Sequence, residues 1–312
     1  MRKPTWLLFG LLVGVIVHAS NRPENNGFDL ADSLVPIDQI ALGGPPRDGI
    51  PSIDDPVFIG SREADFLNDD DRVLGLDYDG EVRAYPVRIL NWHEVVNDRI
   101  GDASVAVTYC PLCGTGVAFD ATDGDGQRTF GVSGLLYNSD VLLYDRETES
   151  LWSQLMMRAI SGPEKGVHLE PLPLQHTSWQ AWREQHPDTR VLSTDTGFAR
   201  DYKRSPYDGY AQSEGLYFSV SAQSQRYHPK EQVLGLEIDG QFKAYPFAEL
   251  ARVAGDTIDD TLGGEQIRIL FNAANRSAKA LDSAGHPLPA VTSFWFAWYA
   301  FHPDGDVFVA SQ

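Results

Sequence analysis

The residues best suited to chemistry are the two cysteines of the 312-residue chain, which lie close together as Cys110-Pro111-Leu112-Cys113-Gly114. Two cysteines at this spacing can bind a metal ion, form a structural disulfide or act as a redox-active dithiol. A tight turn after the first cysteine would point both sulfurs toward one place, and a glycine admits the backbone conformation that such a turn needs. The sequence therefore places the candidate chemistry at this motif.

The metal interpretation needs further ligands, because one such turn supplies two thiolates and the chain has no third cysteine. Cys-Pro-x-Cys-Gly is similar to the metal-binding turn of rubredoxin-like and zinc-ribbon proteins. His93 is the first candidate for a third ligand, since it lies on a short helix-like segment just before the cysteine strand. The weaker candidates are Asp140, His168, His176 and Glu94. Two thiolates and an imidazole with an open position suit copper or zinc. The alternative for His93 is a helix residue bonded to a nearby carbonyl.

Two other uses of the cysteines stay open. Cys-Pro-x-Cys is also the glutaredoxin-like pattern, in which the first cysteine begins a helix and has a low pKa. Residues 114–119 (GTGVAF) are poor helix formers and alternate as a strand does, so metal binding ranks above a redox-active dithiol. A Cys110–Cys113 disulfide is the third interpretation, and it would suit a noncatalytic binding or scaffold protein.

A second group of polar side chains follows between residues 138 and 154. Such a density of donors, acceptors and charges predicts the lining of a polar pocket. The alternative is a loop closed by Asx turns and a local network of ion pairs. The pocket candidates are Asn138, Ser139, Asp140, Tyr144, Arg146, Glu149, Trp152 and Gln154.

An internal repeat predicts how these residues are positioned. Residues 73–86 read VLGLDYDGEVRAYP and residues 233–246 read VLGLEIDGQFKAYP. Each copy predicts a β-hairpin, because Asp-Gly between alternating apolar runs favours a type I′ turn. When the alignment is continued with a small gap, Cys110 falls on Asn272 and Cys113 on Asn275. The second copy thus retains a similar scaffold without the thiols, which favours a function for the cysteines.

We therefore expect a mainly β (α+β) protein with two related β modules and a few short helices. Residues 177–184 predict one of these helices, which ends before His186-Pro187. The expected division is a signal peptide (1–19), an extended N-terminal arm (20–50), a first β module with the cysteines (51–160), a connecting region with the short helix (161–230) and a second β module without cysteine (231–312).

The N-terminus predicts export to the periplasm or the extracellular space. Met1-Arg2-Lys3 is basic, residues 6–17 are apolar, and Val17-His18-Ala19 is typical of a signal cleavage site. We expect no stable membrane insertion after cleavage, since the apolar run is short. The formal net charge of −19 argues against nucleic acid as a partner. A small-molecule or metal-donor partner stays unidentified.

Four long segments resemble the DUF3179 family of exported prokaryotic proteins. They are NWHEVVND (91–98), VTYCPLCGTGVAFD (107–120), FGVSGLLYNSDVLLYDRETESLWSQ (130–154) and SFWFAWYAFHPDG (293–305). The resemblance covers roughly residues 35–310 and implies an exported protein that folds as a single unit. It implies no reaction, because the family name records an unknown function. Whether the chain is a metalloenzyme, a redox protein or a noncatalytic binder is therefore left open by the sequence.

Overall fold

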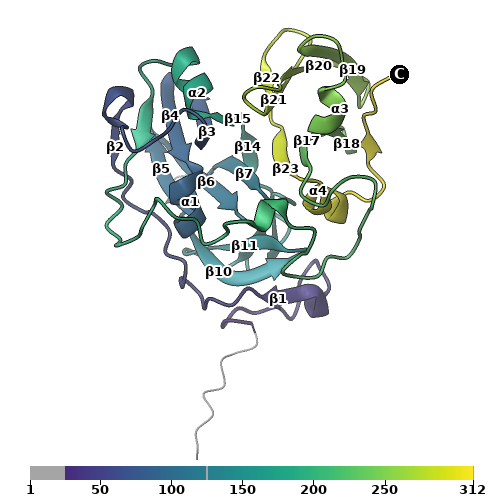
Figure 1. Ribbon diagram of the computed structural model, residues 1–312. Coiled ribbons are helices and arrows are strands. Elements are labelled where there is room, and N and C mark those ends of the chain that lie inside the picture. The colour runs from purple at the N-terminus through teal and green to yellow at the C-terminus, as the bar shows by residue number, and fades with distance from the viewer. Residues whose placement is uncertain (1–24, 124–125, 312) are drawn as a thin grey trace, which may run out of the picture.

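The computed structural model describes residues 25–123 and 126–311 (Figure 1). The protein is mainly β with a few short helices, as expected, and five small sheets are arranged as a five-bladed β-propeller. The predicted signal peptide and the first residues of the predicted arm lie outside the described residues. Within the described ranges, no helix is both long and apolar enough to cross a membrane.

The first copy of the repeat forms the centre of the β3–β4 sheet. Strands β3 and β4 pair across Asp79-Gly80, so the predicted hairpin is confirmed. The outer strands come from other parts of the chain, and β16 runs parallel to β4. The elements are β2 (Phe58–Gly60), β3 (Arg72–Tyr78), β4 (Glu81–Pro86), α1 (Val87–His93), β15 (Leu174–Ser178), α2 (Trp179–Gln185) and β16 (Arg190–Leu192). Helix α2 is the short helix that the sequence predicted.

Two further sheets position the candidate site. The β6–β7 sheet consists of β5 (Val95–Ile100), β6 (Ala103–Cys110), β7 (Thr115–Asp120) and β14 (Glu170–Leu172). The β10–β11 sheet consists of β1 (Ile40–Leu42), β10 (Phe130–Tyr137), β11 (Asp140–Asp145), β12 (Leu151–Ser153) and β13 (Arg158–Ser161). A two-stranded ribbon of β8 (Thr122–Asp123) and β9 (Gly126–Gln127) lies between them in sequence.

The second copy of the repeat forms the remaining two sheets. The β17–β18 sheet consists of β17 (Gln232–Ile238), β18 (Gln241–Pro246), β23 (Val291–Phe294) and β24 (Asp306–Val307). The β20–β21 sheet consists of β19 (Thr257–Leu262), β20 (Glu265–Asn272), β21 (Ser277–Leu281) and β22 (Pro287–Leu288). The helices here are α3 (Phe247–Leu250) and α4 (Trp295–Phe301). The β17–β18 hairpin has the register of β3–β4 shifted by 160 residues.

The similarity between the two copies extends beyond the repeat that the sequence shows. In each copy an edge strand, a seven-residue helix and a short strand parallel to the hairpin follow one another: β15, α2 and β16 in the first, β23, α4 and β24 in the second. Each helix places a tryptophan against a hairpin glycine, Trp182 on Gly75 and Trp298 on Gly235. This shared contact explains why both hairpins carry glycine in the middle of a strand, since a larger side chain would overlap the tryptophan.

The segment at residues 25–50 packs along the β10–β11 sheet. Its strand β1 pairs with β10, and Leu34 N donates to the carbonyl of Ile160 at 2.8 Å. Phe28, Leu30 and Val35 are buried in a cluster with side chains of the same sheet. The extended arm therefore contributes to the core.

Gly75→Ala should destabilise the protein by at least about 1–3 kcal/mol, because a methyl group there would overlap the indole of Trp182. Denaturant unfolding of the purified chain measures the change. Gly215→Ala is the matched control, since a Cβ at Gly215 meets no atom within 4 Å. Equal midpoints for the two variants would contradict the tight packing of α2 on β3.

Candidate metal centre

The turn between β6 and β7 holds both cysteines. Cys110 is the last residue of β6 and pairs with Thr115, the first residue of β7. Gly114 has a φ of +60°, and a Cβ there would lie 2.9–3.0 Å from the ring of Phe294. The backbone N–H of Phe294 donates to the carbonyl of Cys113 at 2.7 Å. Glycine is thus required at position 114 both by the positive φ and by the contact with Phe294. The hydrogen bond from Phe294 attaches the turn to strand β23.

A second tight turn, between β10 and β11, faces the first. Asn138 and Ser139 both have positive φ, 51° and 65°, as a type I′ turn requires. The side-chain amide of Asn138 donates to the carbonyl of Ala300 at 3.3 Å, and its oxygen accepts the N–H of Ser221 at 2.7 Å. These bonds anchor the turn to the second half of the chain. Asp140 follows as the first residue of β11.

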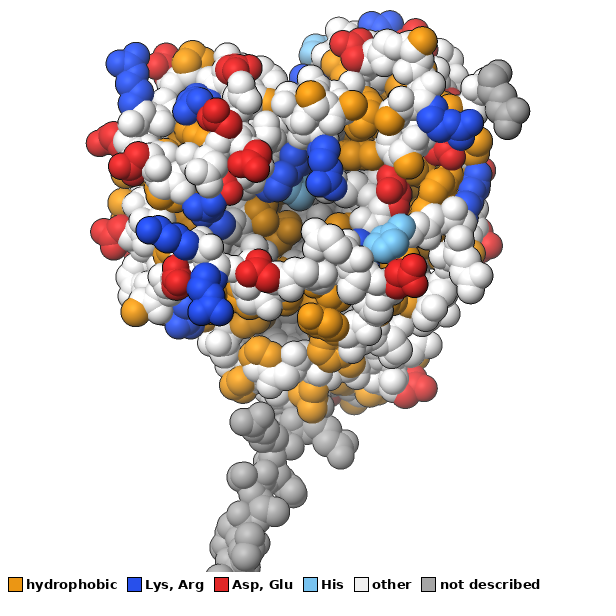
Figure 2. Space-filling model, in the orientation of Figure 1, with side chains coloured by type: hydrophobic (Ala, Val, Ile, Leu, Met, Phe, Trp, Pro, Cys, Tyr) orange, Lys and Arg blue, Asp and Glu red, His pale blue; other side chains and the backbone are white. Residues whose placement is uncertain are grey.

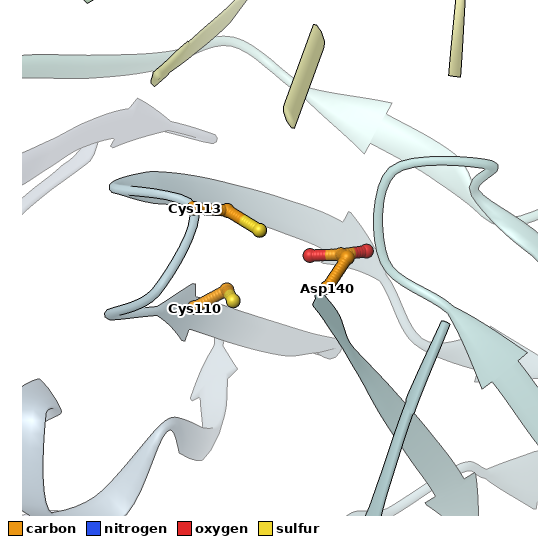
Figure 3. Close-up of side chains that lie close together, drawn as sticks. All are labelled: Cys110, Cys113 and Asp140. Atoms are coloured by element: carbon orange, nitrogen blue, oxygen red, sulfur yellow. The ribbon is translucent and has the colours of Figure 1, made fainter. Parts of the chain in front are cut away.

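The two turns bring Cys110, Cys113 and Asp140 together (Figure 3). All three side chains are buried, and one ligand atom of each lies within 4.8 Å of the other two. Both thiols lie near the carbonyl oxygen of Ser139, with S···O distances of 3.8 Å for Cys110 and 3.4 Å for Cys113. The cysteines are free thiols rather than a disulfide. Two sulfurs and a carboxylate therefore converge on one buried space.

Two polar atoms at this space are buried without a hydrogen bond among the described residues. They are one carboxylate oxygen of Asp140 and the hydroxyl of Ser139. The other oxygen of Asp140 accepts the N–H of Leu155 at 3.0 Å. Buried polar atoms normally have partners, so this pair of atoms points to a ligand of the space.

The electrostatics of the site disfavour negative charge in the absence of a cation. Burial raises the pKa of Asp140 to about 7 and raises the pKa of both thiols, that of Cys113 well above its usual value. The neighbouring carboxyl group of Asp140 raises the pKa of both thiols further. At neutral pH both cysteines are thus protonated, which makes them poor nucleophiles.

Glu94 is a further acidic group near the site. It is buried, has a φ of 59° at the C-terminal cap of α1, and its carboxylate accepts the hydroxyl of Tyr207 at 3.4 Å. Burial raises its pKa to about 8, and the charge of Asp140 acts in the same direction. A residue with positive φ whose buried acid group has a strongly shifted pKa often marks a functional position. The sequence gave Glu94 only as a weaker ligand candidate.

The structure corrects the expected third ligand: Asp140, and not His93, is grouped with the two sulfurs. The His93 ring is held elsewhere, with one nitrogen 2.7 Å from the carbonyl of Pro51 and the other 2.7 Å from the hydroxyl of Tyr202. Both ring nitrogens thus have partners, and the ring is fully buried. His93 is a structural helix residue, the alternative that the sequence left open. Of the other weaker candidates, His168 contacts the guanidinium of Arg158.

The pocket candidates between 138 and 154 are separated by the structure. Asn138, Ser139 and Asp140 form the turn at the site, and the Gln154 amide lies nearby, donating to the Thr108 hydroxyl at 2.8 Å. The other four candidates form hydrogen bonds or ion pairs with residues outside this group. These bonds join Tyr144 to Asp48, Arg146 to Ser52 and Asp54, Glu149 to Arg47, and Trp152 to Asp145.

Comparison with known proteins assigns most of the chain to one family. The model of the family described as "Protein of unknown function (DUF3179)" matches residues 47–305, a range that contains both cysteines, Glu94 and Asp140. Neither the search of curated proteins nor the search of solved structures gave a match.

Glu94→Gln should change how the stability of metal-free protein depends on pH. The folded pKa of Glu94, about 8, lies above its ordinary value of 4.5, so its stabilising contribution is complete below pH 4.5 and is lost as pH rises toward 8. Between pH 5 and 8 the wild type should therefore lose free energy of unfolding relative to Glu94→Gln, by up to about 1.4 kcal/mol per pH unit. Denaturant unfolding across this range measures the difference.

Glu249→Gln is the control for this prediction. Glu249 is also buried, but its hydrogen bonds hold its pKa below the usual value, so it does not titrate between pH 5 and 8. This variant should keep the wild-type slope. A Glu94→Gln slope that matches the wild type would show that Glu94 is already ionised in the fold.

Proposed function

The chain belongs to the DUF3179 family, and we propose that it binds one zinc or copper ion through the thiolates of Cys110 and Cys113 and the carboxylate of Asp140. The observation that carries the proposal is the convergence of these three buried acidic side chains within 4.8 Å of one another. Thiolates favour zinc and copper over hard cations such as magnesium or calcium.

Charge balance supports a metal ion at this position. Two thiolates and a carboxylate carry three negative charges, which would be costly in a buried space unless a cation were bound. A divalent ion would leave one net negative charge. The carbonyl oxygen of Ser139, close to both sulfurs, is in place as a fourth donor or as an acceptor for a bound water molecule.

A metalloenzyme and a metal carrier both use such a ligand set, and Glu94 favours the enzyme. Catalytic zinc sites keep three protein ligands and an open position, whereas structural sites are usually closed by four. A carboxyl group with a pKa of about 8 can both give and accept a proton near neutral pH. Glu94 would thus act on a proton of a bound water molecule or substrate.

The two alternative uses of the cysteines have less support. A redox-active dithiol needs a thiolate with a low pKa, whereas burial raises both thiol pKa values here. Strand β7, and not a helix, follows Cys113. A disulfide would suit a scaffold protein, but it would leave the buried carboxyl group of Asp140 without a role.

We infer three further properties from the sequence. The two copies of the repeat represent related β modules, of which the second has Asn272 and Asn275 in place of the cysteines; the matching hairpin registers support this. Export of the protein is supported by the basic start and the short apolar run. The acidic composition supports a partner other than nucleic acid.

Cys110→Ser and Cys113→Ser should each abolish stoichiometric zinc binding by the reduced protein, because the second thiolate is lost. Asp140→Asn should weaken zinc binding by about 10-fold or more, since an amide oxygen replaces a charged ligand. Competition with a chromophoric chelator measures the affinities. Asp145→Asn is the matched control: Asp145 is a buried carboxylate on the same strand, bonded to Trp152 and Thr148. Equal affinity of wild type and both cysteine variants would exclude the site.

Zinc binding at pH 7 should release about two to three protons, because both thiols are protonated in the metal-free fold and the carboxyl group of Asp140, with a pKa of about 7, is partly protonated. All three groups ionise when they bind the metal. The apparent affinity should therefore rise with pH. Calorimetric titrations in two buffers with different ionisation enthalpies give the number of protons. A value near zero would mean that the cysteines are not the ligands.

A further inference from the structure

A pair of arginines lies where the β3–β4 sheet meets the β20–β21 sheet. Arg72 begins β3, and Arg276 lies in the turn between β20 and β21. The guanidinium of Arg72 donates to the carbonyl of Asn275 at 2.6 Å and to that of Arg276 at 3.0 Å. It also donates to the carbonyl of His176 at 2.9 Å. Arg72 is thus held rigidly across the boundary between the two copies of the repeat.

Neither arginine is neutralised by an acid in the structure. Among the described residues, no ion pair joins Arg72 or Arg276 to a carboxylate, and Arg276 donates to the neutral amide of Gln232 at 2.7 Å. The Nε of Arg72 is buried without a hydrogen-bond partner. Burial, together with the nearby charge of Arg276, lowers the pKa of Arg72 to about 10. Two positive charges are therefore held close together, and the Nε–H of Arg72 has no acceptor among the described residues.

His176 adds two more unused polar atoms to this place. The side chain, on β15, is 6% exposed, and both of its ring nitrogens are buried without a hydrogen-bond partner among the described residues. Burial and the charges of the two arginines hold its pKa well below the usual value, so the ring is neutral and has one N–H to donate. A buried imidazole without partners is uncommon, and a bound acceptor would satisfy it.

Figure 2 shows a hollow near the middle of the face, with basic side chains and a histidine at its upper edge. In the orientation of Figure 1, this hollow lies between the β3–β4 sheet and the second half of the chain, over the region of β7. Arg276 is exposed, so a solute can reach the pair.

We propose that Arg72, Arg276 and His176 form a binding site for the oxyanion group of a small ligand, a carboxylate or a phosphate. The guanidinium group matches both oxyanions in shape and donates charge-assisted hydrogen bonds to them. The imidazole N–H supplies a further donor from the floor of the site. Such a ligand would balance the two positive charges and occupy the unused donors at once.

Tyr109 connects this anion site to the cysteines. Its ring packs edge-on against His176 with a centroid distance of 6.2 Å, and the next residue along β6 is Cys110. The anion site and the cysteines are therefore neighbours along β6. The anion site itself is independent of the metal.

The test uses the full mature chain, titrated with sodium phosphate or sodium acetate and compared with sodium chloride at equal ionic strength. Calorimetry and the shift of the unfolding midpoint report binding. Wild type should bind one anion per chain, and Arg276→Gln should bind it about 10-fold or more weakly, because an exposed charged donor is lost without a change to the core. Tighter binding of acetate would identify a carboxylate site, and tighter binding of phosphate a phosphate site.

Arg268→Gln is the control, because Arg268 is exposed on β20 of the same sheet but is paired with Asp259. It should bind the anions as the wild type does. Cys110→Ser should also keep anion binding, and Arg276→Gln should keep zinc binding, so the two proposals can fail separately. Binding of phosphate and acetate no stronger than that of chloride, or equal binding by Arg276→Gln and wild type, would overturn the anion site.

Discussion

The contact between Phe294 and the cysteine turn is the constraint on which the site depends. The N–H of Phe294 binds the carbonyl of Cys113, and its ring closes over Gly114 so tightly that no other side chain fits there. Strand β23 thereby determines where the turn ends and where the sulfur of Cys113 points. The facing turn is anchored to α4 in the same way, by the bond from Asn138 to the carbonyl of Ala300. The three candidate ligands come from the first half of the chain, but the second half holds them in place.

In the second copy of the repeat the roles are reversed, because a residue of the first copy holds the turn in place. The turn that corresponds to the cysteine turn, Asn272–Asn275, is held by Arg72 from the first copy. Correspondingly, β23 contacts β7 and β15 contacts β21, so each copy places its edge strand against the other's hairpin. This exchange explains why the second copy needs a similar scaffold although it has no thiols. It also explains why the candidate metal centre and the arginine pair occur at the same boundary.

The sequence predicted what depends on neighbouring residues and missed what depends on distant ones. The hairpins at Asp79-Gly80 and Asp239-Gly240, strand β7 and helix α2 follow from local turn and strand patterns. The candidate third ligand does not follow from such patterns. His93 is close to Cys110 in sequence, whereas Asp140 reaches the sulfurs only through the packing of two sheets. The correspondence of α2 with α4 is hard to predict from sequence, since the two segments share just Trp-x-Ala-Trp and the His-Pro-Asp that follows three residues later. An acid directly after a positive-φ turn, as at Asn138-Ser139-Asp140, is the signal that could have favoured Asp140.

Unbalanced charge is the common feature of the two sites. Near the cysteines, four acidic groups including Glu94 are buried, and the raised pKa values of Asp140, Glu94 and both thiols show what their ionisation would cost. At the boundary, two arginines and a neutral imidazole lie together without an acid. The two groups do not neutralise each other, since no ion pair among the described residues joins Arg72 or Arg276 to Asp140 or Glu94. Each group is therefore free for a ligand of opposite charge: a cation at the sulfurs and an oxyanion at the arginines. Replacing buried charged groups with apolar side chains of similar volume is often neutral or stabilising, so stability alone does not account for either group, and their presence supports the two proposed binding sites.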